Sequence, residues 1–319
     1  MKIVKSSVSI LPQRPGVDGL MKHVEKIGRL AYKSEDKITE DSWERFDNML
    51  FSRGHWAVFN SGTVYLSIPE EDRYYLEIFF KTAPYTRWYH NSVTGTYEIT
   101  TDLRIIYQHN LEGVMKKYWC EPTENHYHRV TTRWICSRGI SHELARHRAF
   151  SFLQESQRYV NYSKDRFGKE LTFILPQWIY RVRKDIASSI DSQTGLSRSY
   201  IHDLDGQELW EDLTVWDRTI AAFDRSWRNI EIDYLYVTST DEGEKLKPEE
   251  ARGLLPNDIK TELCMTGYIE DFTYIPSEDT PEKAGFFSLR CAKDAHPDMQ
   301  VLANDLKQQF IDTGLYNLK

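Results

Sequence analysis

RGISHELARHRAFSFLQESQRYVNYSKDRFG, residues 138–168, is the most informative stretch of this 319-residue sequence. Two guanidinium groups flank an imidazole at Arg146, His147 and Arg148, and Ser156 and Arg158 follow. Because arginine binds phosphate oxygens through two parallel hydrogen bonds, this cluster predicts an anion site. The run after it mixes aromatic side chains with small polar donors, which is typical of a nucleotide-binding loop. A solvated basic face at a helix end is the alternative.

Neighbouring residues exclude several common active sites. His142 and Glu143 begin an H-E-x-x-H pattern, but Arg146 stands where the second histidine belongs, so we expect no zinc-protease centre and assign no metal ligands. Glu143 and His147 are four residues apart on a predicted helix, where the two side chains would pair. No G-x-S-x-G, P-loop or G-x-G-x-x-G pattern occurs, which excludes the usual hydrolase, phosphate-loop and dinucleotide-fold fingerprints.

Composition limits the class of protein. The net charge is -7, which does not suit a protein that coats nucleic acid or an anionic membrane. No apolar run approaches the length of a membrane span, and the first residues lack the apolar core of a secretory signal. The cysteines are far apart, so we expect reduced thiols in a cytoplasmic protein, with neither a disulfide framework nor a cysteine-based zinc site. They are Cys120, Cys136, Cys264 and Cys291.

Hydrophobic periodicity and β-branched residues predict a mixture of strands and helices. The predicted strands are residues 2–10, 62–68, 96–107, 129–136 and 171–175. The predicted helices are residues 23–31, 41–52, 108–118, 139–148, 208–236, 248–272 with an interruption at Pro256, 286–290 and 299–310. A polar surface excursion is expected over 181–206. Because strands and helices do not alternate regularly, the sequence predicts an α+β fold in one domain.

The spacing of Arg146-His147-Arg148 and Ser156, with seven residues between, is the signature of the flavin-dependent thymidylate synthases. The sequence resembles that family over residues 138–168. Further similar segments follow the family order, at residues 27–42, 53–55, 250–266 and 286–299. The resemblance implies one α+β domain over residues 1–319, a sheet flanked by long helices. It also implies a homotetramer with active sites at subunit interfaces. Subgroup insertions are expected near residues 69–127, 177–206 and 273–284.

The resemblance also implies an activity: reductive methylation of dUMP to dTMP with methylenetetrahydrofolate, FAD and NADPH, without an enzyme nucleophile. Arg290 corresponds to the family's catalytic arginine, which ionises N3 of the uracil; a fixed guanidinium there would stabilise the anionic ring. The residues implied to contact FAD are His55, Arg146, His147, Arg148 and Gln154. Those implied to contact dUMP are Glu143, Arg146, Gln154, Glu155, Ser156, Gln157, Arg158, Arg252 and Arg290.

Four positions depart from the family pattern. Ala57 and Asn60 replace a hydroxyl and an acidic residue, and Tyr268 and Glu270 replace an Asn and an Arg on the flavin side. A charge reversal about 4 Å from an anionic cofactor is worth roughly 4 kcal/mol at an effective dielectric near 20, before solvent screening. Three interpretations follow: a normal synthase with compensating residues, a relative that methylates or hydroxymethylates C5 of another pyrimidine nucleotide, or a non-catalytic nucleotide-binding relative. The intact signature favours the first.

Overall fold

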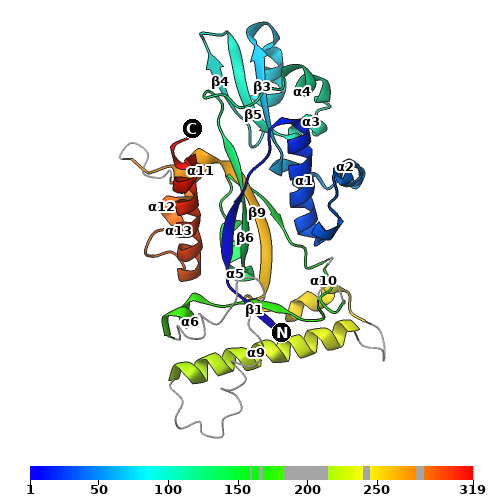
Figure 1. Cartoon of the computed structure of the whole chain (residues 1–319), viewed down its shortest axis with the longest axis vertical. Helices are drawn as coiled ribbons and strands as arrows, with labels where there is room; N and C mark the ends of the chain where they lie inside the picture. The colour runs from blue at the N-terminus through cyan, green and yellow to red at the C-terminus, as the bar shows by residue number, and fades with distance from the viewer. Residues whose placement is uncertain (159, 165–167, 183–214, 240–244, 278–283, 319) are drawn as a thin grey trace. The chain divides into compact units, whose positions relative to one another are not determined.

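The computed structural model describes residues 1–158, 160–164, 168–182, 215–239, 245–277 and 284–318 (Figure 1). The chain forms two compact units. The first unit consists of Met1–Ser7, Ile135–Leu144 and Glu155–Glu262, and the second of Val8–Trp134, Ala145–Gln154 and Leu263–Lys319. The single-domain interpretation stays a prediction, since each unit is built from separate stretches of chain.

Helices and strands are mixed along the chain, which confirms the α+β class. The strands are β1 Lys2–Val4, β2 Ser7–Leu11, β3 Thr63–Pro69, β4 Arg87–Asn91, β5 Thr96–Asp102, β6 Arg129–Ser137, β7 Ser151–Gln154, β8 Thr172–Ile174 and β9 Lys260–Tyr268. The α-helices are α1 Gly16–Tyr32, α2 Ser42–Ser52, α3 Leu103–Gln108, α4 Glu112–Tyr118, α5 Arg138–Leu144, α6 Gln177–Val182, α9 Val215–Ser239, α10 Pro248–Ala251, α11 Ile269–Thr273, α12 Phe286–Arg290 and α13 Pro297–Asp312. None of the helices in the described ranges is both long and apolar enough to cross a lipid bilayer.

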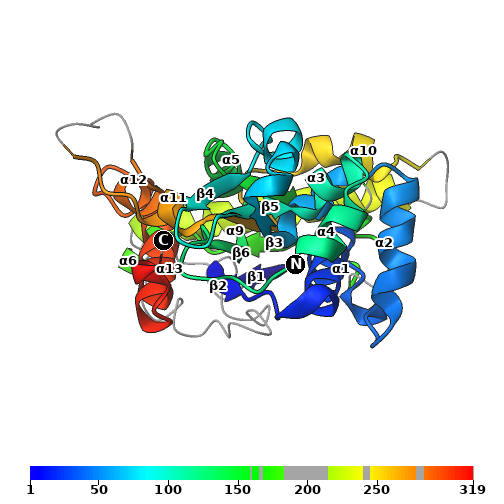
Figure 2. The same ribbon diagram turned by 90° about the horizontal axis from the view of Figure 1, so that it is seen from above.

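Most residues of the two larger sheets belong to the second unit. Strands β2, β6, β9 and β7 pair in that order, and β7 runs antiparallel to β9 with Ser151 opposite Thr266. Strands β3, β5 and β4 form a separate antiparallel sheet. Helix α1 packs beside α2 (Figures 1 and 2) and buries Leu20 and Val24 in the main core. The apolar stripe of α1 therefore supplies one wall of this core.

The expected insertion at residues 69–127 contributes to the core of the second unit. Buried Leu76, Phe80, Ile99 and Ile106 from this segment share one hydrophobic cluster with α1. Asp102 ends β5 and accepts a hydrogen bond from the backbone N–H of Ile105 at 3.1 Å. This side-chain cap starts α3, so the strand predicted over 96–107 ends five residues early.

The first unit has its own core around α9. Strand β1 runs parallel to β8, with Ile3 opposite Phe173. Phe173 stacks on Trp227 of α9 with ring centroids 5.3 Å apart. Tyr234 of the same helix is buried in the same hydrophobic cluster. Pro248 occupies the first turn of α10, as predicted, because its missing N–H needs no partner there.

Two predicted helices are wrong in ways that matter for the site. The helix predicted to continue after Pro256 to residue 272 is strand β9 over Lys260–Tyr268, followed by the short α11. All of its residues after Lys260 are buried, and a short apolar run of this kind does not distinguish a buried strand from a helix. The helix predicted over 139–148 ends at Leu144, so Glu143 and His147 do not share a helix face.

Other expectations fall outside the described residues. They include most of the surface excursion over 181–206, the start of the helix predicted from residue 208, most of the expected insertion at 177–206 and half of the one at 273–284. All four cysteines lie in the described part of the chain, and none forms a disulfide there.

Close packing at Gly267 provides a test of the second unit. An added Cβ there would lie 2.2 Å from Cδ1 of Phe150. Gly267→Ala should therefore lower the free energy of unfolding by about 1–3 kcal/mol, the usual cost of overpacking. Gly113→Ala is the control, since nothing lies within 4 Å of its added Cβ on α4, and it should stabilise by up to about 1 kcal/mol. Urea unfolding measures both; equal stability of the two variants would contradict the packing.

Candidate active site

The signature segment leaves helix α5 before its charged residues. Arg146 and Arg148 are exposed, while His147 between them is half-buried. The imidazole packs edge-to-face on Phe286, with ring centroids 5.1 Å apart, and near Phe150 at 6.3 Å. This aromatic contact turns His147 inward and the two arginines outward.

Arg290 meets the signature directly. Its Nε donates a hydrogen bond to Nε2 of His147 at 2.8 Å, although the two residues are 143 apart in sequence. Burial, together with the charges of Arg290 and Arg146, lowers the pKa of His147 to about 4. The imidazole is therefore neutral at neutral pH, and its proton lies on Nδ1 because Nε2 is the acceptor.

A cavity of about 390 Å³ lies at this contact. Its walls are Arg146, His147, Leu289, Arg290, Asp294 and Ala295. The two guanidinium groups give it a positive side, which suits an anionic or electron-rich ligand. The structure thus brings together three of the predicted site residues: Arg146, His147 and Arg290.

Gln154 and Arg148 belong to the same segment, Gln154 on strand β7 and the exposed Arg148 just before it. Gln154 is the last residue of β7, pairs with Leu263 of β9 and is half-buried. The antiparallel ladder fixes the height of Gln154 along β9. These residues were expected to form part of a loop, but residues 151–154 form a strand.

Glu155 belongs to a buried ionic network in the first unit. Its backbone N–H donates to the carbonyl of Glu262 at 2.8 Å, and its carboxylate accepts from Tyr162 Oη at 3.1 Å and from Lys260 Nζ at 3.2 Å. Lys260 also donates to the Glu262 carboxylate at 2.5 Å. These contacts fix the position of Glu155, and thereby the start of the segment that follows it. Lys260 was missed by the sequence analysis, since a lone lysine carries no motif.

The next three residues are predicted site residues: Ser156, Gln157 and Arg158. Ser156 Oγ accepts a hydrogen bond from the backbone N–H of Arg158 at 3.3 Å. Gln157 is only 8% exposed, and its side-chain nitrogen has no hydrogen-bond partner among the described residues. A buried donor without an acceptor costs free energy, so this amide is suited to an acceptor on a ligand.

Arginines gather around α10 in the same unit. Arg158 is exposed and forms an ion pair with Glu249 of α10 at 3.6 Å, and the exposed Arg252 ends that helix. Burial and the nearby charge of Arg252 lower the pKa of Arg138. Arg138 was missed by the sequence analysis, although it opens the quoted stretch. Arg138 and Arg252 lie near each other, and their guanidinium groups suit a phosphate.

The predicted site residues divide between the two units. Glu143, half-buried near the end of α5, lies in the first unit with Glu155, Ser156, Gln157, Arg158 and Arg252. His55, Arg146, His147, Arg148, Gln154 and Arg290 lie in the second. That both sets serve one nucleotide stays a prediction.

His55 and Asn60, in and just after the family-like segment at residues 53–55, have partners within the second unit. The hydroxyl of Tyr32 hydrogen-bonds Nδ1 of His55, and the two rings stack. Asn60 donates to Asp102 at 2.8 Å and accepts from Arg104 at 3.3 Å. Both Asn60 partners come from the expected insertion, whereas Ala57 is exposed.

The departures at Tyr268 and Glu270 also engage the expected insertion. The Tyr268 hydroxyl lies 2.8 Å from the carbonyl oxygens of Tyr85 and Thr100, to either of which it can donate. Arg87 of β4 binds Glu270 and Asp271 through separate nitrogens, each at 2.6 Å. Its guanidinium also lies over the Tyr268 ring, 4.2 Å from the centroid. Arg87 therefore compensates the charge reversal, from a segment that the sequence analysis did not connect to Glu270.

The family model and the curated relatives that match this chain carry related descriptions. The family model described as thymidylate synthase complementing protein, Thy1, matches residues 122–313. Two curated proteins, both described as flavin-dependent thymidylate synthase, align over 168 residues, which is 53% of this chain and 48% of each relative. The Pyrococcus furiosus protein is 26% identical and the Pyrococcus abyssi protein 25% identical. The chain thus spans about half the length of these relatives.

Solved structures show more distant likeness. A UMP/dUMP methylase, PolB from Streptomyces cacaoi, bound with 5-Br UMP, has 13% identity and a TM-score of 0.40, with 98% of this chain and 92% of that chain covered. Thymidylate Synthase X from Helicobacter pylori with FAD and dUMP has 17% identity and a TM-score of 0.32, with 56% and 66% covered.

The family match includes the signature segment, the strand β9 and the arginine at position 290. It covers more than half of the chain and agrees with the order of motifs in the sequence. This chain therefore belongs to the thymidylate synthase complementing protein family, the flavin-dependent thymidylate synthases.

Proposed function

We propose that this chain catalyses the reductive methylation of dUMP to dTMP, with FAD as cofactor and with methylenetetrahydrofolate and NADPH as co-substrates. The observation that carries the proposal is the hydrogen bond from Arg290 to His147 at the cationic cavity. It joins the family signature to the arginine that the family places at the pyrimidine. Membership of the family supports the reaction class.

The chemistry assigned to Arg290 follows from its geometry. C5 of uracil is a poor nucleophile while N3 keeps its proton, so the reaction needs a group that stabilises the ring anion. A guanidinium held through Nε by a neutral imidazole is fixed in plane and need not reorganise when the charge develops. Protonation of His147 would remove the acceptor, and its low pKa prevents this at neutral pH. No enzyme nucleophile is required.

The donor set suits the two anionic ligands. Arg146 and Arg148 are exposed cations that suit the phosphates of FAD, and Gln154 and His55 lie in the same unit. When bound, the flavin would supply the redox chemistry, and the protein would orient it. For the nucleotide, Gln157 offers an amide donor that has no partner among the described residues, and Arg158 and Arg252 offer cations.

A related one-carbon reaction at C5 of another pyrimidine nucleotide is the second candidate. Tyr268 and Glu270, which hold Arg87 instead of matching the family pattern, favour it, because they change the residues on the flavin side. We further propose a homotetramer in the cytoplasm, with active sites at subunit interfaces, as the family resemblance implies.

The central test combines cofactor binding with product analysis. The purified protein should be yellow or should turn so on addition of FAD, with flavin absorption that changes on addition of dUMP. With methylenetetrahydrofolate and NADPH it should convert dUMP to dTMP, identified by mass. Parallel reactions with UMP separate the second candidate, and a hydroxymethyl product would be heavier by one oxygen. A protein that binds dUMP but neither FAD nor a one-carbon donor would contradict the proposal.

Arg290→Ala should abolish most turnover while the fold stays intact. Removal of one preorganised donor to a developing anion costs roughly 10²–10³-fold in kcat. Lys293→Ala, which removes an exposed cation three residues further on, is the matched control and should keep normal turnover. Circular dichroism checks the fold of both variants. Near-normal turnover of Arg290→Ala would show that the role is misassigned.

Arg252→Ala should act mainly on nucleotide binding. Loss of a charge-assisted hydrogen bond to phosphate costs about 1.5–3 kcal/mol, which raises the Kd for dUMP roughly tenfold or more. Calorimetric titration measures the Kd. Arg73→Ala, which removes another exposed arginine that pairs with Glu70 and Glu77, should leave it unchanged. Equal affinities for the two variants would exclude Arg252 from the phosphate site.

A further inference from the structure

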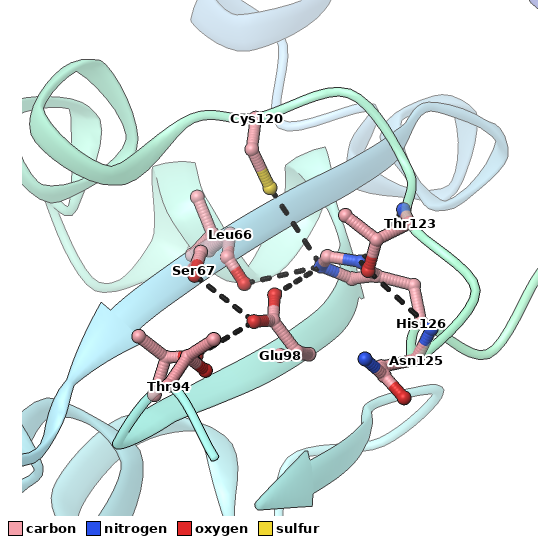
Figure 3. A network of polar contacts seen from close by, with 9 residues as sticks. Leu66, Ser67, Thr94, Glu98, Cys120, Thr123, Asn125 and His126 are labelled. Atoms are coloured by element: carbon pink, nitrogen blue, oxygen red, sulfur yellow. Dashed lines mark hydrogen bonds and ion pairs between the residues drawn. The ribbon is translucent and has the colours of Figure 1, made fainter. Parts of the chain in front are cut away.

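Glu98, Cys120 and His126 bring three metal-ligating atoms together inside the second unit (Figure 3). Glu98 lies on β5, and the other two lie in the connection between α4 and β6. Their carboxylate, thiol and imidazole atoms all lie within 4.8 Å of one another. None of the three belongs to the proposed active site. Their separation in sequence hid them from the sequence analysis, which expected no zinc site.

The two separations measured from His126 match those of a tetrahedral metal site. Nε2 of His126 is 3.3 Å from Oε2 of Glu98 and 3.7 Å from Sγ of Cys120. With ordinary zinc bond lengths and tetrahedral angles, these ligand separations would be about 3.4 Å and 3.6 Å. The carbonyl oxygen of Leu66, 3.2 Å from the same nitrogen, adds a further oxygen to the cluster.

The buried carboxylate of Glu98 has no lysine or arginine partner among the described residues. The Glu98 side chain is 7% exposed and that of His126 is fully buried. Oε1 of Glu98 accepts from Ser67 Oγ at 3.1 Å and from Thr96 Oγ1 at 2.8 Å, whereas Oε2 has no hydrogen-bond partner among the described residues. Within those residues, His126 is the sole ion-pair neighbour of Glu98.

The imidazole of His126 does not supply a positive charge beside Glu98. Its Nδ1 accepts a hydrogen bond from the backbone N–H of Thr123 at 3.1 Å, so the ring is neutral, with its proton on Nε2. A buried carboxylate that faces a neutral ring and a thiol carries an unfavourable desolvation cost unless a positive ion joins it.

We infer that Glu98, Cys120 and His126 bind one divalent transition-metal ion of the zinc type, which fastens the α4–β6 connection to the β3–β5 sheet. On binding, the thiol and Nε2 each release a proton, and thiolate and carboxylate together neutralise the ion. The ring then takes up one proton on Nδ1, where Thr123 Oγ1, 3.0 Å away, becomes the acceptor and the contact with the Thr123 N–H is lost. Carboxylate, imidazole and thiolate are all established zinc ligands.

Titration of the full-length chain with Co²⁺, after treatment with a chelator, tests the inference. Co²⁺ should saturate at one ion per chain and give the visible bands of tetrahedral coordination and the ultraviolet thiolate-to-metal band. Zn²⁺ should displace it, in keeping with its higher affinity for such sites. Zn²⁺ should also raise the Tm of the chelated protein, because it binds the folded state.

Cys120→Ala should lose the thiolate band, and Glu98→Gln should bind Co²⁺ more weakly while it keeps that band. Cys291→Ala, which removes another half-buried thiol, is the matched control and should behave as the unaltered protein does. Absence of a saturable Co²⁺ band in the unaltered protein would overturn the inference, even if Cys120→Ala failed to fold. A thiolate band that survived in folded Cys120→Ala, or vanished in Cys291→Ala, would also overturn it.

Discussion

A layer of aromatic side chains supports the candidate site in the second unit. Phe150 packs on Phe272 with centroids 4.6 Å apart, and Phe286 contacts both of them. His147 rests on Phe286, so the direction of its ring, and hence the place where Arg290 can donate, depends on this packing. Gly267 is needed because Phe150 occupies the space that a side chain on β9 would fill. The chemistry proposed for the pyrimidine thus depends on apolar contacts beside it.

Three of the four departures from the family pattern contact residues of the expected insertion over 69–127. Tyr268 bonds to backbone from the 69–127 segment, Asn60 pairs with Asp102, and Arg87 neutralises Glu270. The residues at positions 60, 268 and 270 thus contact strands β4 and β5, whereas Ala57 is exposed. The charge reversal at position 270 therefore does not leave an isolated negative group. The positive charge that neutralises it comes from Arg87, in the segment over residues 69–127.

Local patterns in the sequence predicted local structure well. The helices at residues 41–52, 286–290 and 299–310 and the strand at 129–136 agree with α2, α12, α13 and β6 within a few residues, because their capping or β-branched residues are adjacent in sequence. Strand β9 was missed because pairing with other strands, which depends on tertiary structure, decided the conformation of an apolar run. Arg290 was assigned to the site only through the family resemblance, since a lone arginine has no pattern, and its hydrogen bond with His147 was not predicted. Arg87, Arg138, Lys260 and the Glu98–Cys120–His126 cluster had no such signature.

The central proposal is that Arg290, together with bound FAD, activates C5 of dUMP. Release of the hydrogen at that carbon tests the proposal most directly. dUMP that carries deuterium at C5 can be incubated with the protein, FAD, NADPH and methylenetetrahydrofolate, and the solvent analysed for released deuterium. We predict release that requires FAD and disappears when Arg290 is replaced by alanine. Full retention of deuterium by nucleotide that is demonstrably bound, with FAD present, would contradict the proposed chemistry.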